Sequence, residues 1–534
     1  MPRREEKPQD LECDVVVIGS GASGSVACQV LVDNGYSVVC VEKGGYWLGQ
    51  FPTDHFDWES LKPSLNPNLR NSMADYFIDT SDSPIDVANF NGVGGSTVFF
   101  SGHYPRFHPS DFRTMSLDGV GVDWPFDYDQ LAPFYLANEK FLGVAGLCGD
   151  PAYPDMMSHL ATPVPLGVAG ETLANTLNDL GWHWWPSYSA IKTVFSNDPT
   201  RSVCKNIGQC NTGCPIGAKG SADVTFLADA LSKGLKLIVN TTALSVIRSN
   251  KGAAAGVVCR DEQGKTFKIY SRAVMLAANA LGSLRVLSGS TDNGDYLGNS
   301  SDQVGRNFMI HPLGYVEGVL AEVDCDSHIG PQGSWIASHE FYETDADREF
   351  KRGYSLQFLK NSGPVELSAK ALIRRKLDFG ANFLEEVKLR LHSTVGVAVI
   401  CEDLPAQENM VVVVTDRKKD KDGLPKLKIR YEISENTRAM MSHGIAKAKI
   451  ILQSAGASDI RGDGPVKFAG WHLTGTTRMG NDPLTSVVAP NGEFHDVPGL
   501  FAIDGGVFPT SAGVNPAATI QAVARKIALE FCSG

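Results

Sequence analysis

The chain has 534 residues and a net charge of -12, with 43% hydrophobic and 20% charged residues. A chain this long exceeds what one hydrophobic core usually sustains, so we expect two closely joined domains. The acidic balance disfavours nucleic acid and anionic membrane as partners, and the composition is typical of a globular protein without a membrane span. A small-molecule ligand fits these properties best.

The N-terminal sequence and the cysteines predict where the protein works. Residues 1–10, MPRREEKPQD, carry two arginines but no apolar stretch or cleavage site typical of an export signal. Eleven cysteines in a chain without such a signal are typical of reduced thiols rather than of a disulfide framework. We therefore expect a cytoplasmic protein.

The first predicted elements form a βαβ unit. Residues 13–18, CDVVVI, predict a buried strand, and the glycine-rich GSGASG follows at once. Residues 25–35, SVACQVLVDNG, have helical spacing and end on a glycine suited to a C-cap. Residues 37–44, SVVCVEKG, predict a second strand. Parallel strands joined in this way are typical of a doubly wound sheet.

The glycine turn of this unit predicts a dinucleotide site. Gly19 permits the tight turn, Gly21 lets the backbone approach a pyrophosphate, and Gly24 allows the helix to pack closely on the sheet. Glu42 ends the second strand, where its carboxylate can bond the ribose hydroxyls of an adenosine. The other residues predicted to contact the cofactor here are Ala22, Ser23 and Lys43.

The remaining elements divide between two domains. Residues 236–279 predict strands and hairpins, and residues 499–531 predict a strand, a glycine-rich turn and a long helix. Both ends of the chain therefore belong to one discontinuous nucleotide-binding domain, and strand-like runs such as STVGVAVI and MVVVVT belong to a covering domain. We expect an α/β fold, α+β overall, in which a Rossmann-like domain is joined to a substrate-binding domain built on an antiparallel sheet. The predicted boundaries are 1–106, 201–312 and 467–534 for the first domain, and 107–200 and 313–466 for the second.

Two further glycine-rich segments favour a flavin over a nicotinamide. Residues 91–102, NGVGGSTVFFSG, form a glycine-rich loop, and AIDGG near the C-terminus places an acid before two glycines. A cofactor contacted by both ends of the chain is large and permanently enclosed, which is typical of FAD. The predicted contacts in these segments are Gly94, Gly95, Ser96, Thr97, Asp504 and Gly505.

The chain resembles the glucose-methanol-choline (GMC) family of FAD-dependent oxidoreductases over essentially its whole length. The resemblance rests on VVVIGSGASGSVAC with its following acid, NGVGGST, VGRNFMIHP, WHLTGTTRMG and FAIDGGVFPTSAGVNPAATIQAVA, in that order. Among family members it is most similar in look to the large subunits of bacterial glucose, fructose and gluconate dehydrogenases and to long-chain alcohol oxidases. The resemblance implies that His472 and Asn515 lie before the flavin N5, and that Asn515, Pro516 and Ala517 also contact FAD.

The chemistry of alcohol oxidation agrees with these two residues. Hydride transfer to a flavin requires removal of the hydroxyl proton, and the pKa of imidazole suits a base near neutral pH. We therefore predict that His472 is the base. The neutral amide of Asn515 can hold and orient the substrate oxygen without competing for the proton. His311 and His103 are predicted to be structural or pocket-lining residues.

We expect FAD to be bound noncovalently. Some relatives attach FAD through a histidine near the glycine loop. In this chain the three residues directly after Thr97 are a valine and two phenylalanines.

A cysteine cluster leaves two interpretations open. RSVCKNIGQCNTGCPIGAKGS, residues 201–221, brings Cys204, Cys210 and Cys214 into one loop. Grouped thiolates suit an iron-sulfur centre, and the segment resembles sugar dehydrogenase large subunits in which three cysteines hold a three-iron, four-sulfur cluster before electrons pass to a cytochrome. The alternative is three reduced thiols in a loop beside the flavin.

We therefore predict FAD-dependent oxidation of an alcohol to a carbonyl, with a sugar, glycoside or polyol as substrate. Two alternatives remain: oxidation of aromatic or long-chain alcohols, and a hydroxynitrile lyase that keeps FAD as a structural element. The sequence leaves open whether oxygen, a soluble acceptor, a small subunit or a cytochrome takes the electrons.

Overall fold

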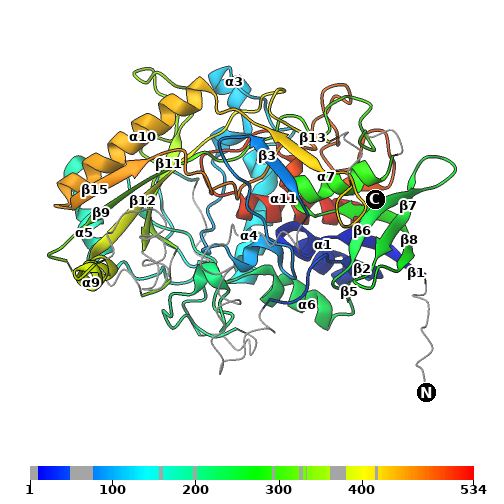
Figure 1. Ribbon diagram of the computed structural model, residues 1–534, viewed down its shortest axis with the longest axis horizontal. Coiled ribbons are helices and arrows are strands. Elements are labelled where there is room, and N and C mark those ends of the chain that lie inside the picture. The colour runs from blue at the N-terminus through cyan, green and yellow to red at the C-terminus, as the bar shows by residue number, and fades with distance from the viewer. Residues whose placement is uncertain are drawn as a thin grey trace.

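The computed structural model describes residues 10–47, 76–154, 160–195, 201–291, 295–323, 329–331, 333–360, 380–414 and 419–534. Figure 1 shows two main sheets side by side, with β1 and the C-terminus both at the side of the larger sheet. Within the described ranges, every helix is too short or too polar to cross a membrane.

The larger sheet has seven strands in the order β5-β2-β1-β8-β7-β6, with β16 also paired to β8. β1 is parallel to β2 and β8, and β16 is parallel to β8, whereas β6, β7 and β8 form antiparallel hairpins. The mixture confirms the predicted Rossmann-like core with added hairpins. Its strands are β1 (Leu11–Ile18), β2 (Val38–Val41), β5 (Lys236–Ile238), β6 (Thr242–Arg248), β7 (Ala254–Arg260), β8 (Thr266–Leu276) and β16 (Leu500–Ala502).

The sequence of β8 explains how parallel and antiparallel pairing meet in one strand. Its first part, TFKIYSR, alternates exposed and buried residues, as expected where a hairpin has one solvated face. Its last part, AVML, is wholly buried between β1 and β16. The helices associated with this sheet are α1 (Ala22–Asp33), α4 (Tyr128–Leu142), α6 (Phe226–Ser232), α7 (Asn279–Gly289) and α11 (Ala517–Ser533).

The second sheet has six strands in the order β15-β9-β12-β11-β10-β4, and all its pairs are antiparallel. This confirms the predicted antiparallel sheet. Helix α10 lies across it (Figure 1) and packs on β9, β11, β12 and β15. Its strands and helices are β4 (Trp185–Pro186), β9 (Leu313–Val319), β10 (Ser334–Ser338), β11 (Tyr354–Lys360), β12 (Thr394–Cys401), β15 (Ser458–Asp463), α5 (Gly167–Leu180), α9 (Phe383–Ser393) and α10 (Glu435–Ser454).

A third, three-stranded sheet joins segments that are far apart in the sequence. β13 and β14 form an antiparallel hairpin, and β3 pairs in parallel with β14. The bounds are β3 (Ile78–Asp82), β13 (Met410–Val413) and β14 (Leu427–Arg430), and the short helix α3 covers Thr114–Asp118.

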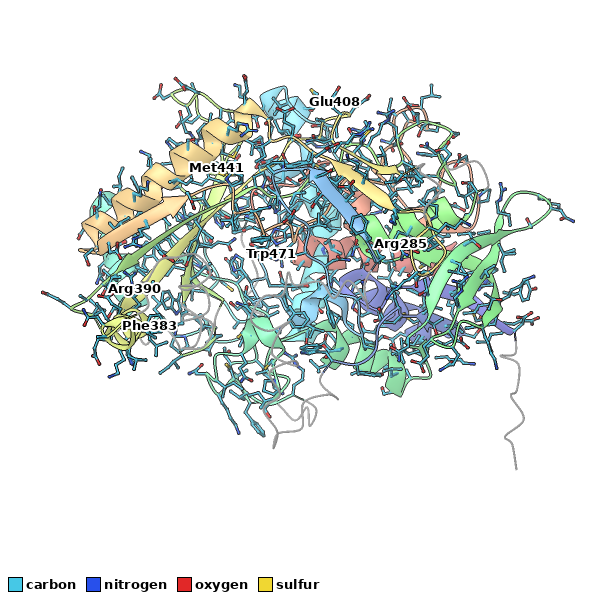
Figure 2. All side chains as sticks on the ribbon, in the orientation of Figure 1. Arg285, Phe383, Arg390, Glu408, Met441 and Trp471 are labelled. Atoms are coloured by element: carbon cyan, nitrogen blue, oxygen red, sulfur yellow. The ribbon has the colours of Figure 1, made fainter. Side chains whose placement is uncertain are left out.

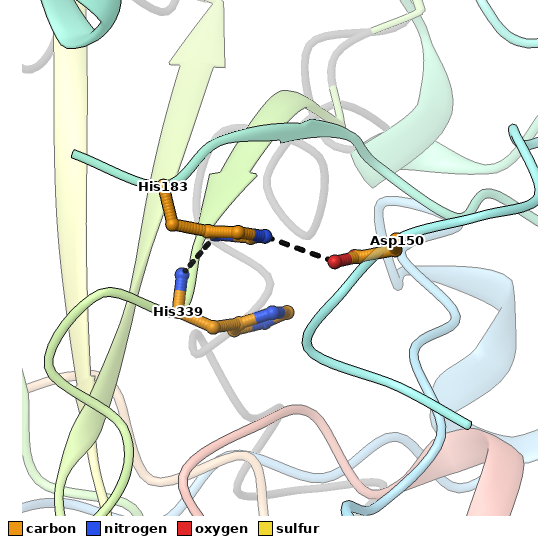
Figure 3. Close-up of side chains that lie close together, drawn as sticks. All are labelled: Asp150, His183 and His339. Atoms are coloured by element: carbon orange, nitrogen blue, oxygen red, sulfur yellow. Dashed lines mark hydrogen bonds and ion pairs between the residues drawn. The ribbon is translucent and has the colours of Figure 1, made fainter. Parts of the chain in front are cut away.

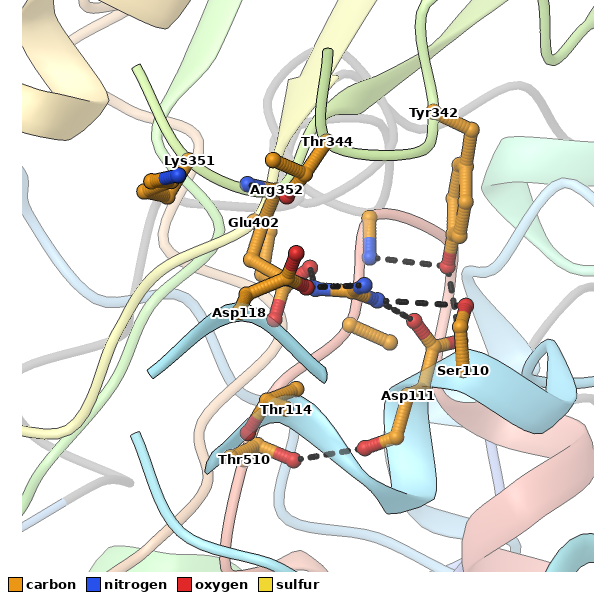
Figure 4. Close-up of polar contacts among 12 residues, drawn as sticks. Ser110, Asp111, Thr114, Asp118, Tyr342, Thr344, Lys351, Arg352, Glu402 and Thr510 are labelled. Atoms are coloured by element: carbon orange, nitrogen blue, oxygen red, sulfur yellow. Dashed lines mark hydrogen bonds and ion pairs between the residues drawn. The ribbon is translucent and has the colours of Figure 1, made fainter. Parts of the chain in front are cut away.

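A buried ionic cluster links the start of β11 to the segment around α3 (Figure 4). The guanidinium of Arg352 is fully buried and contacts the carboxylates of Asp111 at 2.5 Å, Asp118 at 3.0 Å and Glu402 at 3.0 Å. Tyr342 also donates to Asp111 at 2.8 Å. One cation thus satisfies carboxylates from three segments, and removing it would leave them buried without a counterion.

A second polar cluster links the edge of the six-stranded sheet to the loop after α4 (Figure 3). His183 Nε2 and Asp150 Oδ1 are 2.9 Å apart, and the main-chain N–H of His339 donates to His183 Nδ1 at 3.1 Å. Because Nδ1 accepts, Nε2 carries the proton that bonds Asp150. The three side chains place potential metal-ligand atoms within 4.8 Å of one another. Both ring nitrogens of His183 are already used in hydrogen bonds, so the geometry is that of a hydrogen-bonded clamp.

Candidate active site

The glycine turn after β1 forms one end of the site. Gly19 has φ +102°, and a Cβ there would lie 2.5 Å from the carbonyl oxygen of Ala277. A Cβ at Gly24 would lie 1.9 Å from the carbonyl oxygen of Gly19, so α1 packs directly on the turn. Helix α1 begins at Ala22, and its first N–H groups are therefore available to an anion beside the turn.

The carboxylate of Glu42 follows β2 and is held by the same turn. Ser20 donates to it through its main-chain N–H at 3.0 Å and its hydroxyl at 2.8 Å, and the N–H of Gly44 donates at 3.0 Å. Burial raises the pKa of Glu42, and these hydrogen bonds oppose that rise. The acid is fixed in position at the edge of the sheet.

The loop at residues 94–98 lies against the first turn. A Cβ at Gly95 would lie 2.8 Å from the Cα of Gly21, so the two loops touch through their backbones. The fully buried ammonium of Lys219 holds this loop by donating to the carbonyls of Thr97, Val98 and Phe100 at 3.1, 2.5 and 2.9 Å. Burial lowers the pKa of Lys219 to about 8.

The C-terminal turn approaches from the other side. Asp504 follows β16, accepts the hydroxyl of Ser283 at 2.6 Å and accepts the N–H of Gly506 at 2.8 Å. Burial raises the pKa of Asp504 to about 6. A Cβ at Gly505 would lie 2.9 Å from the carbonyl oxygen of Leu473, which leaves room only for backbone at this position.

One elongated cavity of about 180 Å³ connects these segments, and it extends from Glu42 to His472. Figure 2 shows two further lining residues: Trp471 near the middle of the molecule and Arg285 on the side of the seven-stranded sheet. The predicted cofactor contacts that line the cavity are Gly19, Gly21, Ala22, Ser23, Glu42, Lys43, Gly95, Ser96, Thr97, Asp504, Gly505 and Pro516.

The other predicted contacts lie just outside the lining. Gly24 packs on the turn itself, and Gly94, at φ +89°, packs against Asp223. Ala517 is the first residue of α11. Lys43 lines the cavity, but its ammonium contacts the carboxylate of Asp422 at 2.5 Å. The charge of Lys43 is therefore paired with Asp422.

At the far end, His472 is part of a chain of hydrogen bonds that fixes its protons. His311 Nε2 is 2.9 Å from the carbonyl oxygen of Ser511, and since a carbonyl only accepts, Nε2 of His311 carries a proton. Burial lowers the pKa of His311 to about 4, so its Nδ1 is an acceptor. His472 Nδ1 lies 2.8 Å from that atom and must donate. The lone pair of His472 is therefore on Nε2.

Asn515 lies beside this lone pair. Its Nδ2 is 3.4 Å from His472 Nε2, and Gln357 Nε2 donates to its Oδ1 at 2.5 Å. Burial lowers the pKa of His472 well below its ordinary value, and the nearby His311 and His103 add to the effect. The pair thus presents a neutral imidazole nitrogen and an amide N–H, which together can accept a proton and hold an oxygen.

The three cysteines of the predicted cluster lie together beyond the glycine loop. Cys210 and Cys214 are buried and Cys204 is half-buried. They line one small cavity of about 10 Å³, which is room on the scale of a single water molecule. The carbonyl of Cys210 accepts from Lys219 at 2.7 Å, so this loop is fastened to the glycine loop.

Sequence reasoning missed three residues of the site. His311 was interpreted as structural or pocket-lining, yet it bonds the predicted base. Its place in VGRNFMIHP was an available signal. Gln357 interrupts an otherwise apolar strand, YSLQFLK, and Lys219 follows the cysteines. These two were not singled out, because their partners lie more than a hundred residues away in the sequence.

The fold and the site together define an α/β protein with a Rossmann-like sheet, a glycine turn suited to a dinucleotide, and a cavity that ends at His472. Models of the GMC oxidoreductase family match residues 187–313 and 411–524. The chain is similar to 2-methyl-1,2-propanediol dehydrogenase of Mycolicibacterium austroafricanum, with 34% identity over 96% of this chain and 94% of that one. It is also similar to paromamine 6'-oxidase of Streptomyces fradiae, with 30% identity over 98% and 92%.

The chain is also similar to a more distant relative in sequence and to a solved structure in fold. The fructose dehydrogenase large subunit of Gluconobacter japonicus is 28% identical over 97% of this chain and 98% of that one. A variant of formate oxidase from Aspergillus oryzae RIB40, studied for FAD modification, has a TM-score of 0.69 at 15% identity over 98% of this chain and 99% of that one, which shows a shared fold. The chain belongs to the GMC oxidoreductase family. The expected family, fold class, FAD cofactor and oxidation of CH–OH donors are thereby confirmed.

Proposed function

We propose that this enzyme oxidises a primary or secondary alcohol group of a sugar, glycoside or polyol to a carbonyl, with His472 as base and Asn515 as the group that orients the substrate oxygen. The observation that carries the proposal is the cavity that runs from Glu42 to His472. One end of the cavity has the glycine turn and Glu42, which suit a dinucleotide. The other end has His472, a neutral histidine with its lone pair on Nε2.

The cofactor proposed for the cavity is noncovalent FAD, which supplies a two-electron acceptor when bound. The N-terminus of α1 and the turn at Gly19 would hold its pyrophosphate, and Glu42 would bond its adenosine ribose. Asp504 and Gly505 would approach its other half. Acid precipitation should release intact FAD into the supernatant, because no side-chain bond to the cofactor is proposed.

The residues divide the chemistry between them. His472 Nε2 would take the hydroxyl proton of the substrate, and the carbon would give up a hydride to the two-electron acceptor that bound FAD supplies. The alcohol thereby loses two electrons and two protons in total and becomes a carbonyl. The N–H of Asn515 donates to the reacting oxygen and positions it beside His472. His311 keeps the proton of His472 on Nδ1, away from the substrate.

The substrate class is proposed from the names of relatives and from the character of the site. The similar proteins named above are a dehydrogenase of a diol, an oxidase of an aminoglycoside and a subunit of a sugar dehydrogenase. Side-chain amides of Gln357 and Asn515 lie beside the base. Such polar groups can bond a hydroxyl of the substrate, which supports a hydroxylated substrate.

FAD is proposed as the redox centre without an iron-sulfur cluster. The support is that the cavity among Cys204, Cys210 and Cys214 is about 10 Å³, room for about one water molecule, whereas the cofactor cavity on the same measure is about 180 Å³. The thiols belong instead to the loop that Lys219 holds through the carbonyl of Cys210. Iron analysis of the purified enzyme should find less than one iron per chain.

We also propose that the chain forms two domains. Residues 1–106, 201–312 and 467–534 would bind FAD, and residues 107–200 and 313–466 would cover the substrate. Their support is that β1, β8 and β16 share one sheet, whereas β9 to β12 share another. The sheet of β3, β13 and β14 crosses the proposed boundary, so the two domains are tied by main-chain hydrogen bonds as well as by side chains.

The test is an anaerobic spectrum of the FAD-loaded enzyme before and after each member of a substrate panel. The panel holds 2-methyl-1,2-propanediol, fructose, glucose, an aminoglycoside, benzyl alcohol and dodecanol. The proposal expects the flavin absorbance near 450 nm to bleach with a polyhydroxylated compound, and the carbonyl product to appear in equal amount.

Two results would contradict it. Bleaching by dodecanol or benzyl alcohol alone would assign the enzyme to the long-chain or aromatic class. Unbleached flavin with every alcohol, together with release of cyanide from mandelonitrile, would assign it to the lyase class. Re-oxidation by air compared with re-oxidation by ferricyanide then distinguishes an oxidase from a dehydrogenase.

A further inference from the structure

Gln357 is the point at which the six-stranded sheet contacts the catalytic pair. It lies in the middle of β11, is buried, and donates to the Oδ1 of Asn515 at 2.5 Å. Its neighbours on the adjacent strands are Ala398 on β12 and Ala337 on β10. A single long polar side chain therefore stands between two small residues on this part of the sheet.

The alternation of β11 explains why Gln357 points toward the catalytic pair. Tyr354, Leu356 and Phe358 are buried in the core of the covering domain. Because side chains of a strand alternate between faces, Ser355 and Gln357 lie on the opposite face. That face is the one toward Asn515, since Gln357 reaches it directly.

The contact decides which way the amide of Asn515 faces. The oxygen and nitrogen of an asparagine amide can exchange places by rotation, and only one arrangement suits both neighbours. The donor N–H of Gln357 requires Oδ1 of Asn515 on its side, which leaves Nδ2 at 3.4 Å from the lone pair of His472. In the flipped arrangement an amide oxygen would face that lone pair, and no N–H would be left for a substrate oxygen.

We propose that Gln357 is a positioning residue for alcohol oxidation, which acts by holding the amide of Asn515 with its N–H toward the reacting hydroxyl. The inference rests on the proposed function of Asn515. Through Gln357, the six-stranded sheet would affect the reaction, because a shift of β11 moves the donor that orients Asn515.

The experiment measures the rate of flavin reduction and the substrate dissociation constant by anaerobic stopped-flow, with the alcohol that bleaches the native enzyme. Q357M keeps the side-chain volume and removes the donor. Misplacement of a reacting group can cost about 100-fold in rate, so we expect Q357M to be about 10- to 100-fold slower, with a much smaller change in substrate dissociation constant. S338A is the matched control, because it removes a buried hydroxyl from the neighbouring strand β10 away from the pair.

A double-mutant cycle separates positioning from a structural role. If Gln357 acts through Asn515, adding Q357M to N515A should slow reduction by less than about threefold further, because the group that it orients is gone. A merely structural role would slow both backgrounds equally. FAD content and the unfolding temperature of each variant are measured alongside.

The outcomes are distinguishable. Equal slowing in both backgrounds, or reduction of Q357M at the native rate, overturns the inference while the proposed function stands. Failure of the native enzyme to be reduced overturns the proposed function itself. Should Q357M lose FAD, Q357E is the second variant, assayed at a pH high enough to ionise its buried carboxyl group. It has the native size but then offers only acceptors to Asn515, so it should be slow, and native-rate reduction overturns the inference.

Discussion

Removing the acceptor that His311 offers to His472 should slow the reaction without emptying the cofactor site. H311L takes away the Nδ1 that lies 2.8 Å from His472 Nδ1. The buried N–H of His472 then has no partner, which costs about 1–3 kcal/mol. The imidazole escapes this cost by moving its proton to Nε2, and in that form it cannot accept the proton of the substrate.

The magnitude follows from that cost. Since each 1.36 kcal/mol is a tenfold change in rate, we expect flavin reduction by H311L to be about 10- to 100-fold slower. H311N is the informative comparison, because its side-chain oxygen can occupy the position of Nδ1 and restore the acceptor. It should recover most of the rate, although it loses the bond to Ser511.

The assay is anaerobic rapid mixing of each FAD-loaded variant with the reducing alcohol, at matched flavin content. Retention of the native rate by H311L would refute the reasoning about the tautomer. Equal slowing of H311L and H311N would also refute it, because the acceptor would then not be what matters.

Four further predictions concern pH, the cofactor and stability. Because the pKa of His472 is lowered, its neutral form persists into acid. The rate of flavin reduction should therefore fall only below the ordinary histidine pKa of about 6.5. A fall in that rate above this pH would contradict the burial of the base. E42Q replaces one carboxylate oxygen by an amide nitrogen, which is a donor, beside the N–H groups of Ser20 and Gly44. The affinity for FAD, measured by dialysis, should therefore fall at least about tenfold. K219M leaves buried carbonyls without their donor and should lower the free energy of unfolding by about 3 kcal/mol, as measured by urea denaturation, whereas K233M at the surface should change it by less than about 1 kcal/mol. R352M should lower the free energy of unfolding, measured in the same way, by about 3–5 kcal/mol at neutral pH. This loss should shrink as pH falls, because the carboxylates left without a cation have raised pKa values and become protonated.

The elements of the nucleotide-binding sheet could be predicted because their signals are local. The wholly buried run Val15–Ile18, the glycine turn and the acid at the end of β2 are close together in the sequence. The antiparallel character of the second sheet followed from strand-like runs such as that of β12, whose eight residues are all buried.

Long-range contacts could not be predicted in this way. β3 pairs with β14, and Arg352 pairs with Asp111, although the partners are hundreds of residues apart. A buried arginine just before an apolar strand and a buried glutamine within that strand indicate that partners exist but not which ones they are. His311, Gln357 and Lys219 make their hydrogen bonds only through such contacts. The sequence therefore predicted His472 and Asn515 but not the residues that bond them.

The most direct test of the account compares native enzyme with H472A in a single anaerobic turnover, at equal FAD content and saturating alcohol. General-base catalysis contributes about 100- to 10,000-fold, so the account predicts that H472A is reduced at least about 100-fold more slowly while its FAD spectrum before mixing matches that of the native enzyme. Reduction of H472A at the native rate would contradict the central claim that His472 takes the substrate proton.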